Sequence, residues 1–340
     1  MNRMLRLRTL ARTEAKRHTT SGIVAWDRDR LLVNKQSFTL ADLRSMVKGL
    51  CKTVRLQLLK DVLLLDLDER DCVRPGTTAL PGLSIDRLVD HPAELATGWS
   101  FLKHPSNKLD DWPKWLLDRV LAEATLRDRF LCGVDSSQQP ARALWRDYAV
   151  CEYMRGVRRF KESLFALVHL SGGGPGRGTE ITSIQCENSA EGVGYQGVFA
   201  EGGLLSFTTT YHKGYSFSKH VKTTHRYVPR EMLHNDVTRC TAFIWEPEPE
   251  EQWGDDGESD SDSDSSDDRE ELSQSSQQKP KSANLDGYWG TDRIRRVLRK
   301  QTFCYISAAL GTHAWRHAYP AIHRELARDG QARDFLELLY

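Results

Sequence analysis

The chain has 340 residues, of which 39% are hydrophobic and 28% are charged, and its formal net charge at pH 7 is +1. This length and apolar fraction can bury one large or two ordinary cores, and we expect two domains. No apolar run approaches the roughly 20 residues that cross a bilayer, which argues against a membrane partner. The seven cysteines form no C-x-x-C pair, which is typical of a reducing compartment.

The charge is distributed unevenly along the chain. Residues 246–271 contain 14 acidic side chains and one basic side chain, which leaves 47 basic against 33 acidic side chains elsewhere. A basic surplus of this size is what a polyanion-binding surface needs, although evenly scattered solvated charges would give the same count. The acidic, serine-rich tract has too little apolar surface to fold, so we expect a disordered insert, either a linker or a DNA mimic that competes for the basic surface.

The first half of the chain is predicted to be helical. Apolar residues recur at helical spacing from Leu40 to Leu58, and Thr39 with Asp42 forms a capping box at the start of this helix.

Two more amphipathic helices are expected over 112–131 and 141–170, the second with a break or bend near Gly156. The tryptophans of this half stand among leucines at helical spacing, so we interpret them mainly as core residues and secondarily as base-stacking groups. They are Trp99, Trp112, Trp115 and Trp145.

The pattern changes after Gly172 to β-branched and aromatic residues punctuated by glycine. This pattern is typical of strands with tight turns, and we expect two or three strands of a small antiparallel sheet within 193–229. Beyond the acidic tract, two helices are predicted over 290–310 and 311–327, the first strongly basic.

The expected fold class is therefore α+β, with an N-terminal all-helical domain followed by a mixed α/β domain that has a small antiparallel sheet and a disordered acidic insert. The segments expected in chain order are a basic N-terminal arm, a helical DNA-gripping domain, the first part of the mixed domain, the acidic insert and a final pair of helices: 1–36, 37–165, 166–245, 246–284 and 285–340.

A glycine-crowded turn, SGGGPGRGTEITSI at 171–184, precedes a predicted short helix. Bare backbone N–H groups ahead of a helix form an anion site, and the helix dipole adds to it. A nucleotide-binding loop would need a Lys where Thr179 follows Gly178, so we expect no nucleotide cofactor. The plain alternative is a glycine-rich connection between a helix and a sheet.

Basic residues follow this turn in a definite order. Arg177 and Glu180 form R-x-x-E-I at the helix start, and Lys213 lies in the hairpin turn YHKG. His313 and Arg316 then form H-x-x-R on a late helix. Over about residues 160–326 this order resembles the catalytic domain of the tyrosine recombinases, the family of phage integrases and fungal mobile-element recombinases. The chain is also similar to the recombinase-like regions of fungal telomere-linked RecQ-type helicase proteins, although it contains no helicase motif.

The resemblance implies a role for each residue in phosphodiester transfer. Arg177 and Arg316 would each donate two hydrogen bonds to the phosphate oxygens, and Glu180 would hold the guanidinium of Arg177. Lys213 would protonate the leaving 5′ oxygen, and His313 would bind the phosphate or act as an acid or base. Further DNA contacts are expected at Lys219, Lys222, Arg226 and His317, of which the two lysines are also stand-ins for Lys213.

Each of these residues also has a plain structural interpretation. The R-x-x-E pair alone would be a routine i,i+3 surface pair, and Lys213 a solvated turn residue. His313 and His317 lie four residues apart, but Ala314 stands where a metalloprotease helix needs Glu, so no metal is expected.

The nucleophile of the resembled family is a Tyr about 30 residues past the H-x-x-R motif. Here 24 residues follow Arg316, and the last of them is Tyr340. We therefore expect Tyr340 not to attack DNA and the chain to be a shortened copy that is inactive in strand exchange. An intact recombinase whose sequence continues past Tyr340 stays open.

The leading hypothesis is a nuclear protein that binds double-stranded DNA without a cofactor, with assembly of several copies on DNA left open. The alternative is a non-enzymatic basic scaffold or interaction protein, associated with telomeres or chromatin, whose motif matches arise by chance.

Overall fold

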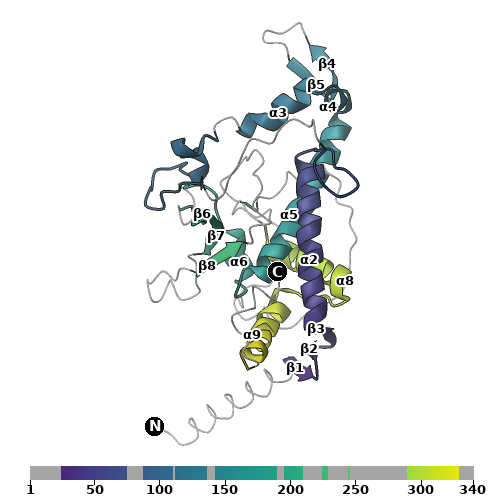
Figure 1. Ribbon diagram of the computed structural model, residues 1–340, viewed down its shortest axis with the longest axis vertical. Helices are drawn as coiled ribbons and strands as arrows, with labels where there is room; N and C mark the ends of the chain where they lie inside the picture. The colour runs from purple at the N-terminus through teal and green to yellow at the C-terminus, as the bar shows by residue number, and fades with distance from the viewer. Residues whose placement is uncertain are drawn as a thin grey trace, which may run out of the picture.

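The computed structural model describes residues 24–74, 87–109, 112–135, 142–189, 195–209, 224–228, 244–245 and 289–328. Within these ranges the chain folds into seven α-helices and three small antiparallel sheets, as expected for an α+β protein (Figure 1). None of the described helices is both long enough and apolar enough to cross a membrane. The acidic tract lies outside the described residues.

The helices and strands follow one another in a simple order. The first sheet is formed by β1 (Val24–Asp27), β2 (Arg30–Val33) and β3 (Gln36–Thr39), the second by β4 (Leu131–Asp135) and β5 (Arg142–Trp145), and the third by β6 (Val198–Glu201), β7 (Leu204–Thr209) and β8 (Thr224–Val228). The helices are α2 (Leu40–Leu56), α3 (Trp112–Ala122), α4 (Ala124–Phe130), α5 (Asp147–Ser171), α6 (Gly178–Thr182), α8 (Thr291–Ile306) and α9 (Thr312–Arg328). Shorter helical segments are η1 (Gln57–Val62), η3 (Phe101–Lys103) and η4 (Pro105–Asn107).

Helix α2 begins as its sequence predicts. The N–H of Asp42 donates to the Thr39 hydroxyl over 3.0 Å, and the N–H of Thr39 donates to the Asp42 carboxylate over 2.9 Å. The capping box is thus confirmed, and these hydrogen bonds lower the pKa of Asp42.

The expectation of an unbroken helical half is wrong in two places. Residues 24–39 form the first sheet, where a basic arm was expected to extend to residue 36. Residues 142–145, which were expected to begin a helix, form β5 and pair with β4 in a hairpin that projects from one end of the molecule (Figure 1). Valine and aromatic residues favour strands in 24–39, whereas β5 has no β-branched residue and is held as a strand by its pairing with β4.

The expected bend at Gly156 is also wrong, because α5 runs without interruption from Asp147 to Ser171. Gly156 instead allows a close contact with η1. A Cβ added at Gly156 would lie 3.2 Å from the Cβ of Asp61, closer than most side-chain contacts. The glycine is therefore explained by packing and not by a change of helix direction.

The interpretation of the first-half tryptophans as core residues is wrong for Trp145, whereas Trp115 packs against a buried cluster formed by η1 and α5. Trp145 is 39% exposed, and Trp99 and Trp115 are half-buried, whereas the side chain of Trp112 lies outside the described part. The tryptophans that fill the core come from the second half of the chain: Trp245, Trp289 and Trp315.

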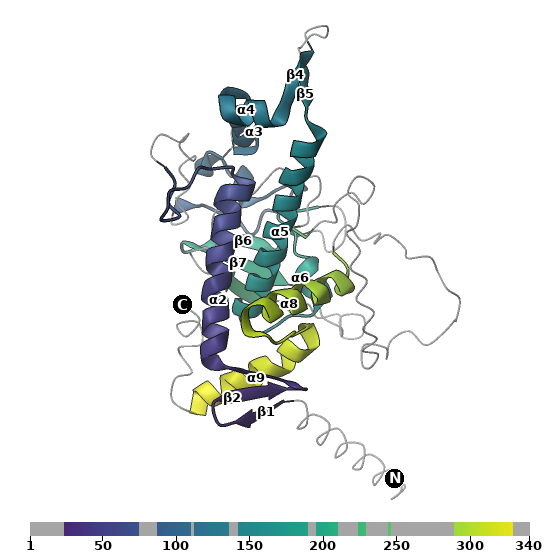
Figure 2. The same ribbon diagram turned by 90° about the vertical axis from the view of Figure 1, so that its right-hand side faces the viewer.

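The main core joins elements from both halves of the chain. Phe165 on α5 packs against Trp245 and Trp289, with ring centroids 5.3 and 6.0 Å away. The same buried cluster includes residues of β2, α2, α6, α8 and α9, and Figure 2 shows α8 crossing beside α2 and α5 with α9 below them. Helix α5 runs through the boundary expected near residue 165, so this one core positions both the sheet β6–β7–β8 and α9.

We predict that Thr39→Ala lowers the free energy of unfolding by about 1 kcal/mol, because it removes the acceptor for the N–H of Asp42. The melting temperature should fall by roughly 2–4 °C for a chain of this size. Ser45→Ala is the matched control, since Ser45 is exposed on the same helix and makes no cap. Equal melting temperatures for Thr39→Ala and Ser45→Ala would show that the cap adds no stability.

Candidate phosphate-binding site

The glycine turn connects α5 to α6. Two of its glycines are required by the backbone: Gly173 has φ of +92°, and a Cβ at Gly172 would lie 2.6 Å from the carbonyl oxygen of Val168. A Cβ at Gly173 would meet no atom within 4 Å. Gly172 and Gly173 therefore cannot carry a side chain without strain, and the space beside Gly173 is open.

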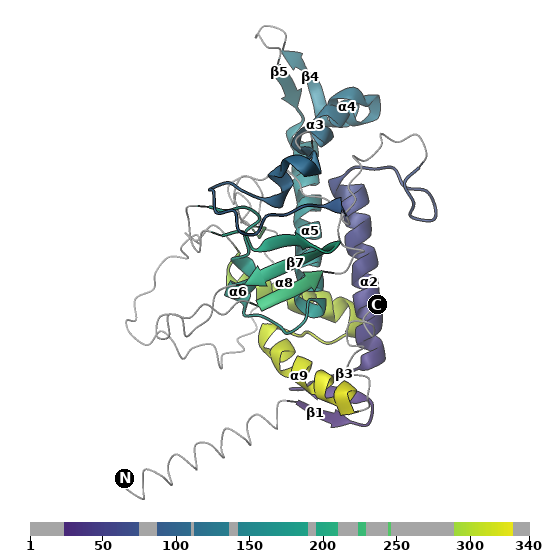
Figure 3. The same ribbon diagram turned by 60° about the vertical axis from the view of Figure 1, so that its left-hand side comes forward.

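A buried arginine lies directly against this turn. Arg226, on β8, is 5% exposed; its Nε donates to the carbonyl oxygen of Gly174 over 3.3 Å, and its Nη1 donates to the hydroxyl of Thr209 over 2.8 Å. A Cβ at Gly176 would lie 2.8 Å from Nη2 of Arg226. The absence of a side chain at Gly176 is thus what allows the turn backbone to cover this guanidinium. Figure 3 shows the sheet that carries β8 beside α6.

Arg177 stands at the N-cap of α6, and Glu180 holds it there. The N–H of Arg177 donates to Oε2 of Glu180 over 2.9 Å, and the guanidinium Nε lies 3.8 Å from Oε1. The pairing expected from R-x-x-E is present, and the side chain of Arg177 remains partly exposed. Glu180 also acts on Arg226: burial lowers the pKa of that arginine, and the charge of Glu180 opposes the shift.

His169 is the residue that sequence analysis missed. It is 1% exposed in the last turn of α5, its ring stacks on Phe165 with centroids 5.7 Å apart, and neither ring nitrogen has a hydrogen-bond partner in the described structure. Burial, followed by the charges of Arg226 and Arg316, lowers the pKa of His169 to about 3, so the ring is neutral near pH 7. The available signal was a single His in the apolar run FALVHL just before the glycine turn.

Helix α9 reaches the same region from the end of the described chain. The charge of Arg316 acts on His169, and a Cβ at Gly174 would lie 4.0 Å from the ring of Tyr319, one helical turn after Arg316. Arg316 itself is exposed. The glycine turn and the H-x-x-R helix are therefore neighbours in space although about 140 residues separate them.

Two of the three histidines of α9, His313 and His317, pair with each other. Nε2 of His313 lies 3.2 Å from Nε2 of His317, with His313 exposed and His317 half-buried. Burial, then the charges of His313 and Arg316, lower the pKa of His317. Two histidines alone do not make a metal centre, and no cluster of three or more His, Cys, Asp or Glu suited to a metal ion occurs among the described residues.

The predicted lysines cannot be placed in this site. Lys213, Lys219 and Lys222 lie in 210–223, outside the described residues, as does Tyr340. Thr209 and Thr224, which flank this segment, pair across β7 and β8. The segment therefore begins and ends beside the strand that carries Arg226.

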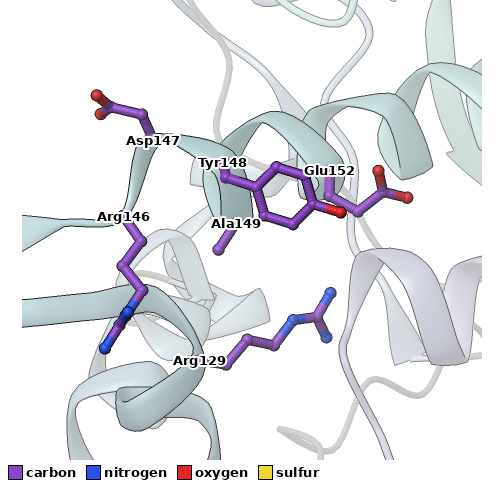
Figure 4. A pocket seen from close by; sticks show the side chains of 6 residues that line it. All are labelled: Arg129, Arg146, Asp147, Tyr148, Ala149 and Glu152. Atoms are coloured by element: carbon purple, nitrogen blue, oxygen red, sulfur yellow. The ribbon is translucent and has the colours of Figure 1, made fainter.

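A hollow of about 390 Å³ lies at the opposite end of α5, where β5 joins the helix (Figure 4). It is lined by Arg129, Arg146, Asp147, Tyr148, Ala149 and Glu152. Twenty-four helical steps separate Asp147 from Ser171, which corresponds to roughly 36 Å. This hollow is therefore remote from the glycine turn and contains none of the residues predicted to bind phosphate.

Four charged residues thus surround the glycine turn. Glu180 pairs with Arg177, and its charge also acts on Arg226. The charges of Arg226 and Arg316 both lower the pKa of the buried His169. Such an arrangement can bind an oxyanion through several charge-assisted hydrogen bonds. Searches against protein-family models, curated proteins and solved structures gave no match to this chain, so the likeness to tyrosine recombinases rests on the sequence motifs.

Proposed function

We propose that the protein binds duplex DNA and holds a backbone phosphate at the glycine turn, using Arg177 and Arg316 as the principal ligands. The observation that carries this proposal is the convergence of three guanidinium-bearing elements, the N-cap of α6, strand β8 and helix α9, around one glycine-rich turn. Arginine is suited to this role because its planar fork binds phosphate through paired hydrogen bonds.

The element types support the tyrosine-recombinase interpretation. Arg177 begins a helix, a β-hairpin formed by β7 and β8 follows it, and the H-x-x-R sequence lies on α9. In this proposal Lys213 would protonate the leaving oxygen and His313 would bind the phosphate or act as an acid or base. Neither role is needed for phosphate binding by the two arginines.

Helix α8 supplies a basic surface next to the proposed site. A Cβ at Gly178 would lie 3.1 Å from Ile294 of α8, so this helix adjoins the start of α6. Arg296, Arg299 and Lys300 contribute to this surface, whereas Arg293 is half-buried between Glu162 and the ring of Trp289, and Arg295 lies 3.6 Å from Asp292. Contacts of this kind bind the DNA backbone without reading sequence, and they fit the basic surplus outside the acidic tract.

We propose that this chain binds DNA without forming a covalent intermediate. Tyr319 is adjacent to the glycine turn, yet burial raises its pKa, which disfavours the phenolate that would attack a phosphate. Tyr319 also lies on α9, one turn after the proposed phosphate ligand Arg316. Nuclear location and assembly of several copies on DNA belong to the same proposal.

A second function, as an interaction protein, is favoured by the projecting hairpin. Trp145 and Leu144 are exposed on β5, and Tyr148 at the start of α5 is 76% exposed. Exposed aromatic residues clustered at one end of a molecule are typical of contact surfaces. This surface is remote from the glycine turn, so the two functions can be tested separately.

We predict that Arg177→Ala and Arg316→Ala each weaken binding to a 30-base-pair duplex by roughly 10- to 100-fold, which is the value of losing one charged hydrogen-bonding pair. Fluorescence anisotropy at one fixed, moderate salt concentration measures the dissociation constant. Arg70→Ala is the control, because Arg70 is an exposed arginine in a turn that follows η1 and contains none of the site residues. Unchanged affinity in both site variants would rule out the phosphate site and leave the interaction function.

We also predict that the protein forms no denaturant-resistant adduct with a pool of nicked DNA duplexes of random sequence. An active tyrosine recombinase on its own nicked substrate is the positive control for trapping the phosphotyrosine. An adduct seen on a denaturing gel with the wild-type chain and lost in Tyr319→Phe would contradict the proposal and assign the attack to Tyr319.

A further inference from the structure

Arg226 is a buried cation whose charge the surrounding described structure does not neutralise. Its two hydrogen bonds to described residues go to neutral acceptors, the carbonyl of Gly174 and the hydroxyl of Thr209. No carboxylate oxygen of a described residue comes within ion-pair distance of it; Glu180 acts from farther away and pairs with Arg177. Burying a charge in this way is costly unless an opposite charge is bound nearby.

His169 provides a second, independent observation at the same place. Its ring is almost fully buried, and both nitrogens lack a partner in the described structure. The guanidinium groups of Arg226 and Arg316 both act on this ring. Two positive charges near a buried neutral ring with unused hydrogen-bonding capacity are better suited to an anion than to the packing of an apolar core.

The glycine turn gives an anion a way to approach. The backbone at Gly176 lies against Nη2 of Arg226, while a side chain at Gly173 would meet nothing within 4 Å. A phosphate oxygen can therefore come close to the backbone on the open side of the turn. Arg177 ends the same turn, and its side chain is partly exposed. The buried guanidinium of Arg226 and the partly exposed guanidinium of Arg177 therefore adjoin the same stretch of backbone.

We propose that Arg226 is a direct ligand of the DNA phosphate, a third guanidinium that binds a phosphodiester oxygen beneath the glycine turn with His169 beside it. This inference rests on the proposed function and changes the role expected for Arg226 from a surface contact on a basic hairpin to a buried ligand. The competing explanation is that Arg226 only supports the turn by donating to the carbonyl of Gly174.

Arg226→Met separates the two explanations when it is made in the Arg177→Ala background, because a supporting role that acts by positioning Arg177 can then no longer change duplex affinity or its salt dependence. Methionine has similar length and removes the charge, so if Arg226 is a phosphate ligand, we expect duplex affinity to fall at least about 10-fold and the slope of log K against log salt to decrease by about one. The melting temperature is measured in parallel, because the substitution removes a buried charge, which favours stability, and also two hydrogen bonds, to Gly174 and Thr209, which opposes it. All affinities are measured well below the melting temperature.

An unchanged salt slope in Arg226→Met would overturn the inference, whatever happens to the melting temperature, because a supporting residue contacts no phosphate. Arg177→Ala and Arg316→Ala measured in parallel keep the two proposals distinct. If these weaken binding and Arg226→Met does not, only the role of Arg226 fails. If none of the three weakens binding, the proposed function itself fails.

A measurement on the wild-type chain covers the case in which Arg226→Met does not fold. The Nε–H signal of Arg226 in a ¹⁵N–¹H spectrum is assigned by its loss in Arg226→Lys, which keeps the charge. Addition of a short duplex should shift this signal together with that of Arg316. A shift of the Arg316 signal without a shift of the Arg226 signal would overturn the inference.

Discussion

The contact between the guanidinium of Arg226 and the backbone of the glycine turn is the constraint on which the proposed site depends. The turn can cover Arg226 because its backbone carries no side chain at Gly176, and its exit direction places Arg177 at the N-cap of α6. Glu180 then fixes Arg177 from the first turn of that helix. One buried charge and a few glycines therefore position the exposed arginine.

The core explains how distant parts of the chain meet at this turn. Helix α5 delivers His169 and ends at the turn, and its Phe165 packs on Trp245 and Trp289. Helix α9 packs into the same buried cluster through Trp315, which lies next to Arg316 in the sequence. Two adjacent residues of α9 thus have different roles. Trp315 anchors the helix in the core, and Arg316 presents a charge to the site. A buried cation near such a core lowers stability, which is common where a protein retains a group for binding.

Local signals in the sequence predicted local structure well. The capping box at Thr39, the strands within 193–229 and the helices after residue 290 follow from residue patterns that act over a few positions. The pairing of Arg177 with Glu180 could be predicted for the same reason, since i,i+3 residues adjoin on a helix.

Features that depend on distant contacts could not be predicted in this way. Gly156 looked like a helix break, but it is a packing contact with a segment about 95 residues earlier. Trp145 looked like core, yet its hairpin projects into solvent. His169 is identified as part of the site through its surroundings, because Arg226 and Arg316 come from β8 and α9.

A crystal structure of the protein bound to a short DNA duplex tests the central claim most directly. We predict that this structure contains one backbone phosphate at the glycine turn, with oxygens about 3 Å from the guanidinium nitrogens of both Arg177 and Arg316. Those two guanidinium groups should then lie within roughly 6–8 Å of each other. DNA bound at another surface, or Arg177 and Arg316 directed to opposite faces, would contradict it.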